Sequence, residues 1–490
     1  MQQKIVEEGF MMQKLSDLKP ERVFYYFEEI TKIPRCSGSE KQISDYLKKV
    51  GEDLGLKVIQ DELNNIIIKK PATKGYENSE GIILQGHMDM VCEKEEQVDH
   101  DFSTDSIDLI VEDGFIKANG TTLGADNGIA VAMGLAILED DRLEHPMLEL
   151  LITTSEETDM SGALGLKPNV LKGTRLLNLD SEEEGFLTVG SAGGELIKAT
   201  VNTEEESVSG YQALTISVAG LNGGHSGMEI DKNRANALKV SLNILKTLQE
   251  EIAIKLVSID GGTKDNAIPR QMKIVIGVKE EDLEKLEASV TKIETQLKNK
   301  WVEENPQILL DKPTGLQKAL RQIDLENILY LLEQLPTGVH SWLADSENTV
   351  ESSSNLAIVH TEKGKITLSI STRSSSERIL NAMREQITKD IEKVGTFHIS
   401  GGYPEWEYKA DSKLREKAVE LYQKMYGTEM KVIVIHAGLE SGALKKTYPN
   451  LDVVSFGPDM FDVHTPKEKL SIASTKRSYE YLVELLKGLK

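Results

Sequence analysis

Residues 82–89 read Ile-Ile-Leu-Gln-Gly-His-Met-Asp, an apolar run that ends in a histidine and an aspartate. Such a run is typical of a buried β-strand that ends in a loop. His87 and Asp89 are two residues apart, so an extended backbone points both side chains the same way. A neutral imidazole can bind a metal ion, and a carboxylate beside it can orient the ring. Alone, however, the His-x-Asp pattern is weak evidence for a metal site.

The segments around this run alternate between strand-like and helix-like patterns. Strands are expected at residues 65–68, 148–152 and 175–179, and helices at 21–30, 39–54 and 128–138. Strands that alternate with helices predict an α/β layer fold with a mainly parallel central sheet.

The pattern changes near residue 201. Apolar residues then alternate at 214–218, 272–278 and 366–370, with helices expected at 236–249 and 281–298, as in an α+β domain with an antiparallel sheet. After about residue 395 the α/β pattern returns, with helices expected at 413–426 and 472–487 and a strand at 451–456. This order favours a second domain inserted into the first over two consecutive domains.

The composition is that of a globular protein of two domains. The chain has 490 residues, 39% of them hydrophobic and 28% charged, and it lacks the roughly 18 consecutive apolar residues that span a bilayer. A net charge of −23 argues against nucleic acid as a partner. The N-terminal segment is too charged for a secretion signal. Only Cys36 and Cys92 occur, so no disulfide framework is implied, and a reducing cytoplasm is expected.

Four further stretches place acids or histidine beside apolar runs. Asp126 precedes an apolar helical segment, where it serves either as a helix cap or as a carboxylate that bridges two cations. Glu156 and Glu157 end the run at 148–152, where one acid can bind metal while its neighbour acts as a base. Asp180 ends the run at 175–179, and His464 lies near the C-terminus.

Taken together, these residues predict a catalytic metal site. The candidate ligands are His87, Asp126, Glu157, Asp180 and His464. Oxygen and imidazole ligands without a thiolate suit zinc, manganese or cobalt in a catalytic site. Because five ligands exceed what one open catalytic metal needs, the sequence predicts two metal ions that share Asp126.

With these motifs the chain resembles the M20 metallopeptidases, in particular their aminoacyl-histidine dipeptidases. The stretches that carry the resemblance are FEEITKIPRCSGSEK, LQGHMDMVCEK, TTLGADNGIAVA, TTSEETDMSGA, LLNLDSEE, GLNGGHSG, DNAIPR and DVHTPKEKLS. The resemblance runs nearly end to end. It implies a zinc-aminopeptidase-like catalytic domain of residues 1–196 and 396–490 with an inserted lid domain of residues 197–395. It also implies a cytoplasmic location and a possible homodimer.

The resemblance also implies a role for each site residue. His87 and Asp180 would bind one metal ion, Glu157 and His464 the other, and Asp126 both. Asp89 would orient His87, and Glu156 would be the general acid and base. In the lid, His225 would stabilise the oxyanion, and Asn266 and Arg373 would help to hold the substrate, Arg373 through the substrate's carboxylate. Gly438 would lie outside the lid, in a loop near the substrate's C-terminal end.

The expected reaction is hydrolysis of dipeptides, both Xaa-His and others, by water that is activated between two divalent metal ions. Zinc is the first choice for these ions, and cobalt or manganese is possible. Deacylation of N-acyl amino acids and a tripeptidase reaction are the alternatives with the same metal core. A non-catalytic scaffold would lack a ligand or the base, and neither is missing. A serine hydrolase is disfavoured because Gly224–Met228 lacks the final glycine of Gly-x-Ser-x-Gly.

The sequence leaves several points open. They are the preferred dipeptide, the metal in the cell, the oligomeric state, whether His225 acts within its own subunit or on a partner, and whether the chain starts at Met1 or Met12.

Overall fold

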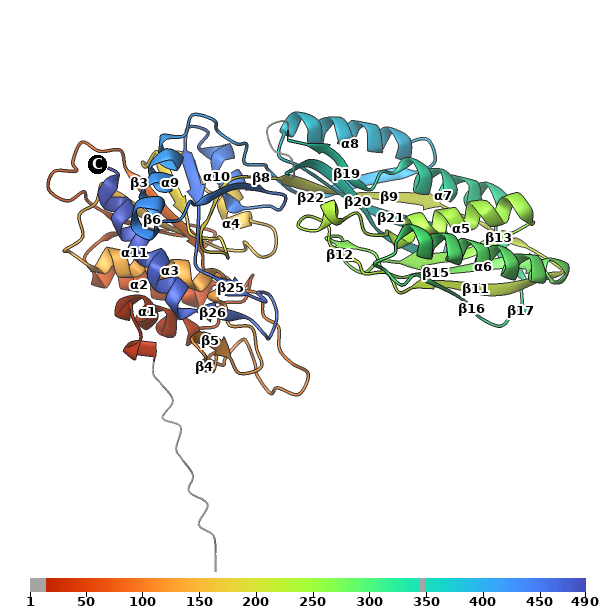
Figure 1. Ribbon diagram of the computed structural model, residues 1–490, viewed down its shortest axis with the longest axis horizontal. Helices are drawn as coiled ribbons and strands as arrows, with labels where there is room; N and C mark the ends of the chain where they lie inside the picture. The colour runs from red at the N-terminus through yellow and green to blue at the C-terminus, as the bar shows by residue number, and fades with distance from the viewer. Residues whose placement is uncertain (1–14, 344–348) are drawn as a thin grey trace, which may run out of the picture. The chain divides into compact units, whose positions relative to one another are not determined.

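The computed structural model describes residues 15–343 and 349–490 and divides into two compact units (Figure 1). The first comprises the chain up to Gly190 together with Tyr408–Val434 and Glu440–Lys490. The second comprises Ser191–Glu407 and Ile435–Leu439. The domain boundaries at residues 197 and 395 remain a prediction from the sequence. Met12, the alternative start, lies outside the described residues.

The first unit is built on an eight-stranded sheet. In sheet order, the strands are β1 (Lys57–Gln60), β2 (Ile66–Lys70), β6 (Leu148–Thr153), β3 (Ile82–His87), β7 (Arg175–Asn178), β24 (Asp452–Ser455), β8 (Phe186–Ser191) and β23 (Lys431–Ile435). The central strands β6, β3, β7 and β24 are parallel. The predicted α/β class is therefore confirmed.

The sheet is mixed, however, rather than mainly parallel. Strands β1 and β2 pair antiparallel with each other, β2 pairs antiparallel with β6, and β8 pairs antiparallel with β24. Residues 61–65, which join β1 to β2, are too few for the crossover that parallel strands need. The sequence pattern shows that a segment is a strand, but such a short connection decides its direction.

The core of this unit lies around β3. Ile82, Ile83 and Leu84 are fully buried, as expected for a parallel strand covered on both faces. Helix α3 (Ala125–Glu139) packs on β3 and is buried along nearly its whole length, which its apolar sequence explains. Helix α1 (Glu21–Thr31) packs against α3 and buries one apolar face. The remaining helices of the unit are α2 (Lys41–Asp53), α4 (Ser161–Leu164), α9 (Lys413–Tyr426), α10 (Glu440–Thr447) and α11 (Ile472–Gly488).

A four-stranded antiparallel sheet in the same unit joins distant parts of the chain. Its order is β25 (Met460–Phe461), β26 (Lys469–Ser471), β5 (Phe115–Ala118) and β4 (Leu109–Glu112). The loop of residues 462–468 connects β25 to β26 and carries His464. Pairing of β26 with β5 therefore fixes this loop to the part of the chain that precedes α3.

The second unit is a large antiparallel sheet with helices packed against it (Figure 1). Its main strands, in sheet order, are β16 (Gln307–Leu310), β11 (Tyr211–Ala219), β15 (Met272–Lys279), β13 (Lys255–Gly261), β20 (Val350–Glu362), β21 (Lys365–Ser374), β9 (Gly193–Asn202) and β22 (Thr396–Tyr403). The helices are α5 (Ala237–Glu251), α6 (Leu283–Lys300), α7 (Gln322–Gln334) and α8 (Glu377–Ile391). Leu214, Ile216 and Val218 alternate into the core, as predicted.

One expectation about the cysteines was wrong. Cys36 and Cys92 form a disulfide, with their Cα atoms 5.7 Å apart. The pairing arises because residues 35–37 run beside residues 88–92, where Cys36 makes a parallel bridge with Met90. Cysteine usage therefore no longer supports the expectation of a reducing compartment.

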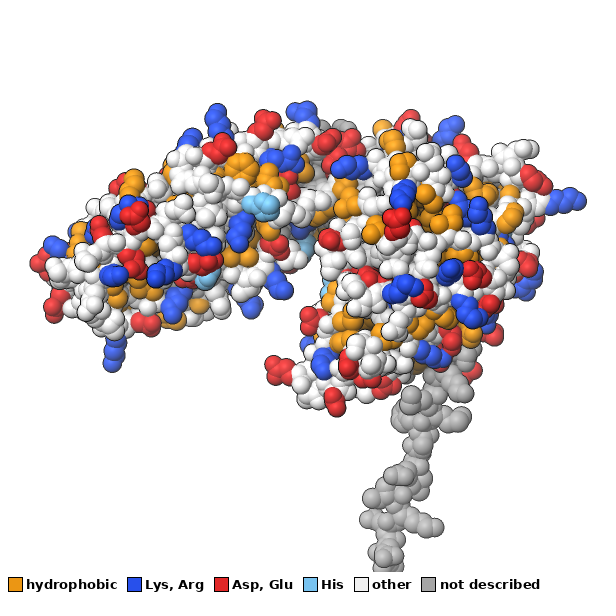
Figure 2. Space-filling model, turned by 180° about the vertical axis from the view of Figure 1, so that it is seen from behind, with side chains coloured by type: hydrophobic (Ala, Val, Ile, Leu, Met, Phe, Trp, Pro, Cys, Tyr) orange, Lys and Arg blue, Asp and Glu red, His pale blue; other side chains and the backbone are white. Residues whose placement is uncertain are grey.

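In the part of the chain that the structure describes, no helix combines the length and the apolar character that crossing a bilayer requires. On the face seen in Figure 2, acidic and basic side chains are interspersed over both units.

Candidate metal centre

The candidate site begins at the carboxyl ends of three neighbouring parallel strands. His87 is the last residue of β3, Glu157 follows β6, and Asp180 follows β7. Because β6, β3 and β7 are adjacent and parallel, their carboxyl ends meet at one edge of the sheet. The three side chains are brought together for this reason.

Asp126 and His464 come from other elements. Asp126 lies at the start of α3, and the residue in the cap position is Gly124, whose φ of 70° is left-handed. The carboxylate of Asp126 does not cap the helix. Its Oδ1 lies 3.2 Å from Nε2 of His87, and its Oδ2 lies 3.1 Å from Nε2 of His464. The helix-cap alternative for Asp126 is therefore wrong, since the side chain faces two imidazoles.

The remaining distances complete two groups around Asp126. Nε2 of His87 lies 3.5 Å from Oδ1 of Asp180. Nε2 of His464 lies 2.9 Å from Oε2 of Glu157. One oxygen of Asp126 therefore faces the pair His87–Asp180, and the other faces the pair His464–Glu157. Ligand atoms of His87, Asp126 and Glu157 lie within 4.8 Å of one another, which suits a bound metal ion.

The electrostatics of this cluster favour a cation. Burial raises the pKa of Asp180 to about 6 and the pKa of Glu156 well above its ordinary value, since the charged carboxylates lose contact with water. Burial disfavours charge on His464, yet hydrogen bonds to Asp126 and Glu157 raise its pKa to about 11. A protonated ring is thus the counter-charge that these acids attract when no metal ion is present.

Asp89 connects two of the strand ends. Its Oδ1 lies 3.3 Å from Nδ1 of His87, and its Oδ2 accepts a hydrogen bond of 2.8 Å from Oγ of Ser37. Its carboxylate also accepts the backbone N–H groups of Glu156 and Glu157, each at 3.2 Å. Asp89 is buried and so holds the His87 ring and the Glu156–Glu157 backbone in one arrangement.

Glu156 differs from Glu157 in its surroundings. Its Oε2 lies 3.9 Å from Nε2 of His87, beyond hydrogen-bond distance, while Glu157 bonds directly to His464. The preceding residue, Ser155, has a left-handed φ of 57°, as does His464 with φ 62°. Such conformations are costly for residues other than glycine and gather at functional sites.

The predicted lid residues, and Gly438 as well, lie in the second unit. His225 is in β12 (Gly224–His225), which pairs with β14 (Ala267–Ile268), next to Asn266. Nδ1 of His225 accepts backbone N–H groups from Gly227 at 3.2 Å and Met228 at 3.0 Å. A neutral His225 ring therefore carries its proton on Nε2, the form that can donate a hydrogen bond.

Arg373 and Gly438 meet around Tyr403. The guanidinium of Arg373 donates to the Tyr403 hydroxyl, and a Cβ on Gly438 would lie 2.6 Å from the Tyr403 ring. His436 was not singled out from the sequence. Its Nε2 forms a hydrogen bond of 2.7 Å with Oγ of Ser353. Burial, followed by the nearby charge of Arg373, lowers the pKa of His436 to about 3, so its ring is neutral.

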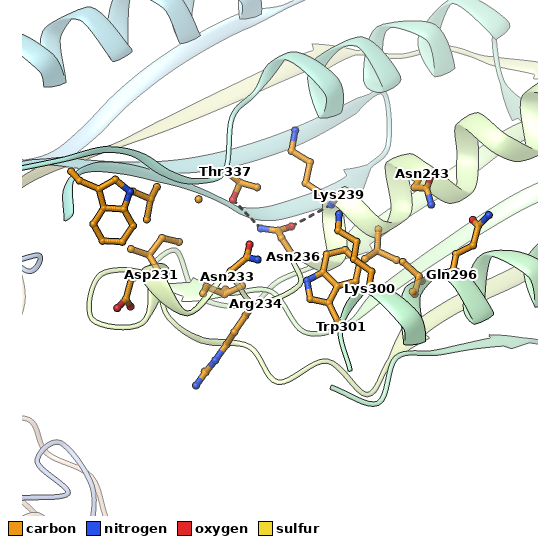
Figure 3. A pocket seen from close by; sticks show the side chains of 17 residues that line it. Asp231, Asn233, Arg234, Asn236, Lys239, Asn243, Gln296, Lys300, Trp301 and Thr337 are labelled. Carbon is orange, nitrogen blue, oxygen red and sulfur yellow. Dashed lines mark hydrogen bonds between the residues drawn. The ribbon is translucent and has the colours of Figure 1, made fainter. Parts of the chain in front are cut away.

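A separate cavity lies within the second unit (Figure 3). It measures about 760 Å³ and is lined by α5, α6 and the loop before α5. Asn236 caps α5 there and donates a hydrogen bond of 3.3 Å to Thr337. Among the described residues, 15–343 and 349–490, the lining of this cavity includes none of the predicted site residues.

Comparison with known proteins identifies the family. Residues 83–488 match Peptidase family M20/M25/M40. This chain belongs to peptidase family M20. The resemblance seen in the motifs is confirmed, the chain is a metallopeptidase-type hydrolase, and its fold is the M20 fold with a catalytic and a lid domain.

Relatives of this M20 peptidase match over nearly its whole length. It is 35% identical over 486 residues to the cytosol non-specific dipeptidase of Escherichia coli (strain K12), covering 98% of this chain and 99% of that protein. The crystal structure of aminoacylhistidine dipeptidase from Vibrio alginolyticus aligns with a TM-score of 0.88 and 34% identity, covering 98% of both chains. Aminopeptidase PepT from Bacillus cereus, with a TM-score of 0.54, 16% identity and coverage of 96% and 99%, shares the fold alone.

Several residues near the candidate site residues of each unit were not singled out from the sequence. Arg35, Glu440 and Glu468 are buried charged residues in the first unit, and Tyr403 and His436 contact or approach Arg373 in the second. Arg35 and Glu468 lie within the motifs PRCSGSEK and HTPKEK, and these motifs were the sequence signal from which both residues could have been found.

Proposed function

We propose that this M20 peptidase is a cytoplasmic dipeptidase that uses two divalent metal ions, zinc first among them. His87 and Asp180 would hold one ion, Glu157 and His464 would hold the other, and Asp126 would serve both. The observation that carries the proposal is the position of Asp126, whose two oxygens face His87 and His464 separately. The 35% identity to a cytosol non-specific dipeptidase over nearly the whole chain supports the substrate class and the location.

The residues present fit such ions by their chemistry. Carboxylate oxygens and imidazole nitrogens, without a thiolate, are the ligands of catalytic zinc, manganese and cobalt sites. His87, Asp126 and Asp180 are nearly inaccessible to water, and buried acids in such numbers need cations. The side chain of His464 is 47% exposed, which leaves a path for a small substrate.

The two ions, when bound, would supply Lewis acidity and would lower the pKa of the attacking water. Glu156 accepts the proton of the attacking water and later donates it to the leaving amine. Burial favours the protonated form of Glu156, which suits the second of these transfers. Asp89 keeps Nδ1 of His87 and the Glu156 backbone in place throughout.

The second unit supplies substrate contacts in this proposal. His225, with its proton on Nε2, donates to the developing oxyanion. Arg373 pairs with the substrate carboxylate, and Asn266 and Gly438 line the same subsite. Residues 197–395 form the lid, and the enzyme works as a homodimer, in which His225 acts within its own subunit or on its partner.

Substrate profiling with metal replacement tests this function. Chelated protein is assayed on dipeptides that include Xaa-His and β-alanyl-histidine, with and without added Zn²⁺, Mn²⁺ or Co²⁺. We expect cleavage of dipeptides to return with metal, and tripeptides and N-acyl amino acids to stay intact. Cleavage of only tripeptides or N-acyl amino acids would replace the dipeptidase assignment, and folded protein that cleaves nothing would overturn it.

A further inference from the structure

Glu468 makes an unusual set of contacts close to the candidate metal centre. It lies in the loop of residues 462–468, four positions after His464, and is only 2% exposed. Its Oε2 accepts the backbone N–H groups of Leu123 at 2.8 Å and Gly124 at 2.9 Å. Its Oε1 accepts those of Ala125 at 2.8 Å and Asp126 at 3.3 Å.

Two of these bonds, to Ala125 and Asp126, satisfy the start of α3 from outside the helix. The first N–H groups of a helix have no partner within it, and they attract negative charge. No side chain caps α3 at Gly124. Glu468, which is 342 residues away from Asp126 in the chain, takes that place with Oε1, whereas its Oε2 accepts the N–H groups of the two residues just before the helix. Two bonds to each oxygen fix the backbone from Leu123 to Asp126.

Arg35 holds the same turn on its carbonyl side. Its buried guanidinium donates to the carbonyl of Gly124 and to those of Met88 at 3.0 Å and Asp89 at 3.2 Å. The turn before Asp126 is thereby tied to the end of β3 as well as to the loop of His464. A buried acid and a buried base thus join three segments that carry expected ligands.

We propose that Glu468 is a positioning residue that sets the metal affinity of the site. It fixes the backbone of Asp126 relative to the loop of His464, so that one carboxylate can face His87 and His464 at once. This inference rests on the proposed two-metal function and deepens it. A group that orients a ligand without touching the metal changes metal affinity about 10- to 100-fold.

The test compares Glu468→Gln with Glu149→Gln. The amide of the first variant keeps the size of the side chain but presents an NH₂ group to two N–H donors. Glu149 is fully buried and accepts the backbone N–H groups of Lys172 at 2.7 Å and Gly173 at 2.8 Å. It lies near the amino end of β6, away from the strand ends that carry the ligands, so it controls for the loss of a buried carboxylate.

The readout is the dissociation constant for Zn²⁺ of the folded, chelated proteins, measured with a competing chelator, together with the visible spectrum of the Co²⁺ form. We expect Glu468→Gln to weaken Zn²⁺ binding about 10- to 100-fold and to alter the Co²⁺ spectrum. Glu149→Gln should lose stability and keep the wild-type dissociation constant. If Glu468→Gln does not fold, Glu468→Asp, which keeps the charge but is too short for all these donors, should show a smaller loss of affinity.

Wild-type affinity and spectrum in a folded Glu468 variant would overturn the positioning role while leaving the proposed function intact. Wild-type protein that takes up no metal would overturn the proposed function and this inference together.

Discussion

Glu156 and Glu157 are neighbours in the chain with different surroundings. Glu157 bonds to His464, whereas Glu156 has a raised pKa and stays beyond hydrogen-bond distance of His87. We expect Glu156→Ala to lower kcat about 10²- to 10⁴-fold, because the proton relay is lost, with nearly normal metal content. Steady-state kinetics and metal analysis check this, with Glu157→Ala as the variant that should lose metal. Wild-type turnover by Glu156→Ala would contradict the assignment.

Glu440 is a buried acid beneath the candidate site. Its Oε2 accepts a hydrogen bond of 2.7 Å from Nε2 of Gln85 and another from Oγ1 of Thr153. Burial raises its pKa from an ordinary value of 4.5 to about 8. The folded state therefore holds this proton more tightly than the unfolded state.

The sign of the pH effect follows from that shift. As the pH rises from about 4.5 to about 8, the contribution of Glu440 makes the fold progressively less stable. In metal-free protein, Glu440→Gln should remove this pH dependence of the free energy of unfolding. The difference in that free energy between the variant and wild type should therefore shift in favour of the variant by on the order of a few kcal/mol from low pH to high pH. Urea unfolding across pH measures the difference, and parallel pH profiles of the two proteins would contradict it.

At the scale of elements, the sequence predicted the strands β2, β3, β6, β7 and β24 of the first sheet, but it missed β1, β8 and β23. His87, Glu157 and Asp180 could be found because each follows an apolar run, and parallel strands bring such ends together. The contacts of Glu468 and Arg35 could not be predicted, because they join segments that are far apart in the chain and leave no periodic signal in the sequence. The antiparallel direction of β2 was missed because apolar periodicity carries no direction.

The disulfide joins two elements that hold the site. Cys36 follows Arg35, Cys92 follows the segment of Asp89, and 56 residues separate the two cysteines. Closing a loop of this length typically stabilises a fold by about 2–4 kcal/mol. We expect dithiothreitol to lower the free energy of unfolding of wild type by that amount and to leave Cys36→Ser/Cys92→Ser unchanged. Equal sensitivity of the two proteins to dithiothreitol would show that the disulfide does not contribute.

At the scale of the whole molecule, the change of pattern near residue 201 and its return near residue 395 indicated an inserted domain. The folds of both units agree with the expected classes. What the pattern could not supply is the pairing order of each sheet, since strands as distant as β9 and β21 are adjacent. Such pairings depend on tertiary packing rather than local sequence.

The lid proposal assigns catalysis to residues from both units. His225→Ala should lower kcat about 10²- to 10³-fold, as loss of an oxyanion donor does, while metal content and KM change little. His360 is a matched control, because it lies in the same unit, pairs with Asp260 at 2.8 Å and has a side chain that is 58% exposed. If His225→Ala and His360→Ala behave alike, the oxyanion role of His225 is wrong.

The most direct test of the two-metal dipeptidase is a titration of chelated wild-type protein with Zn²⁺, in which bound metal and dipeptide hydrolysis are followed together. We expect no hydrolysis without metal and full hydrolysis at two ions per chain, with Asp126→Asn inactive throughout. Undiminished hydrolysis by fully chelated protein, or full hydrolysis by Asp126→Asn, would contradict it.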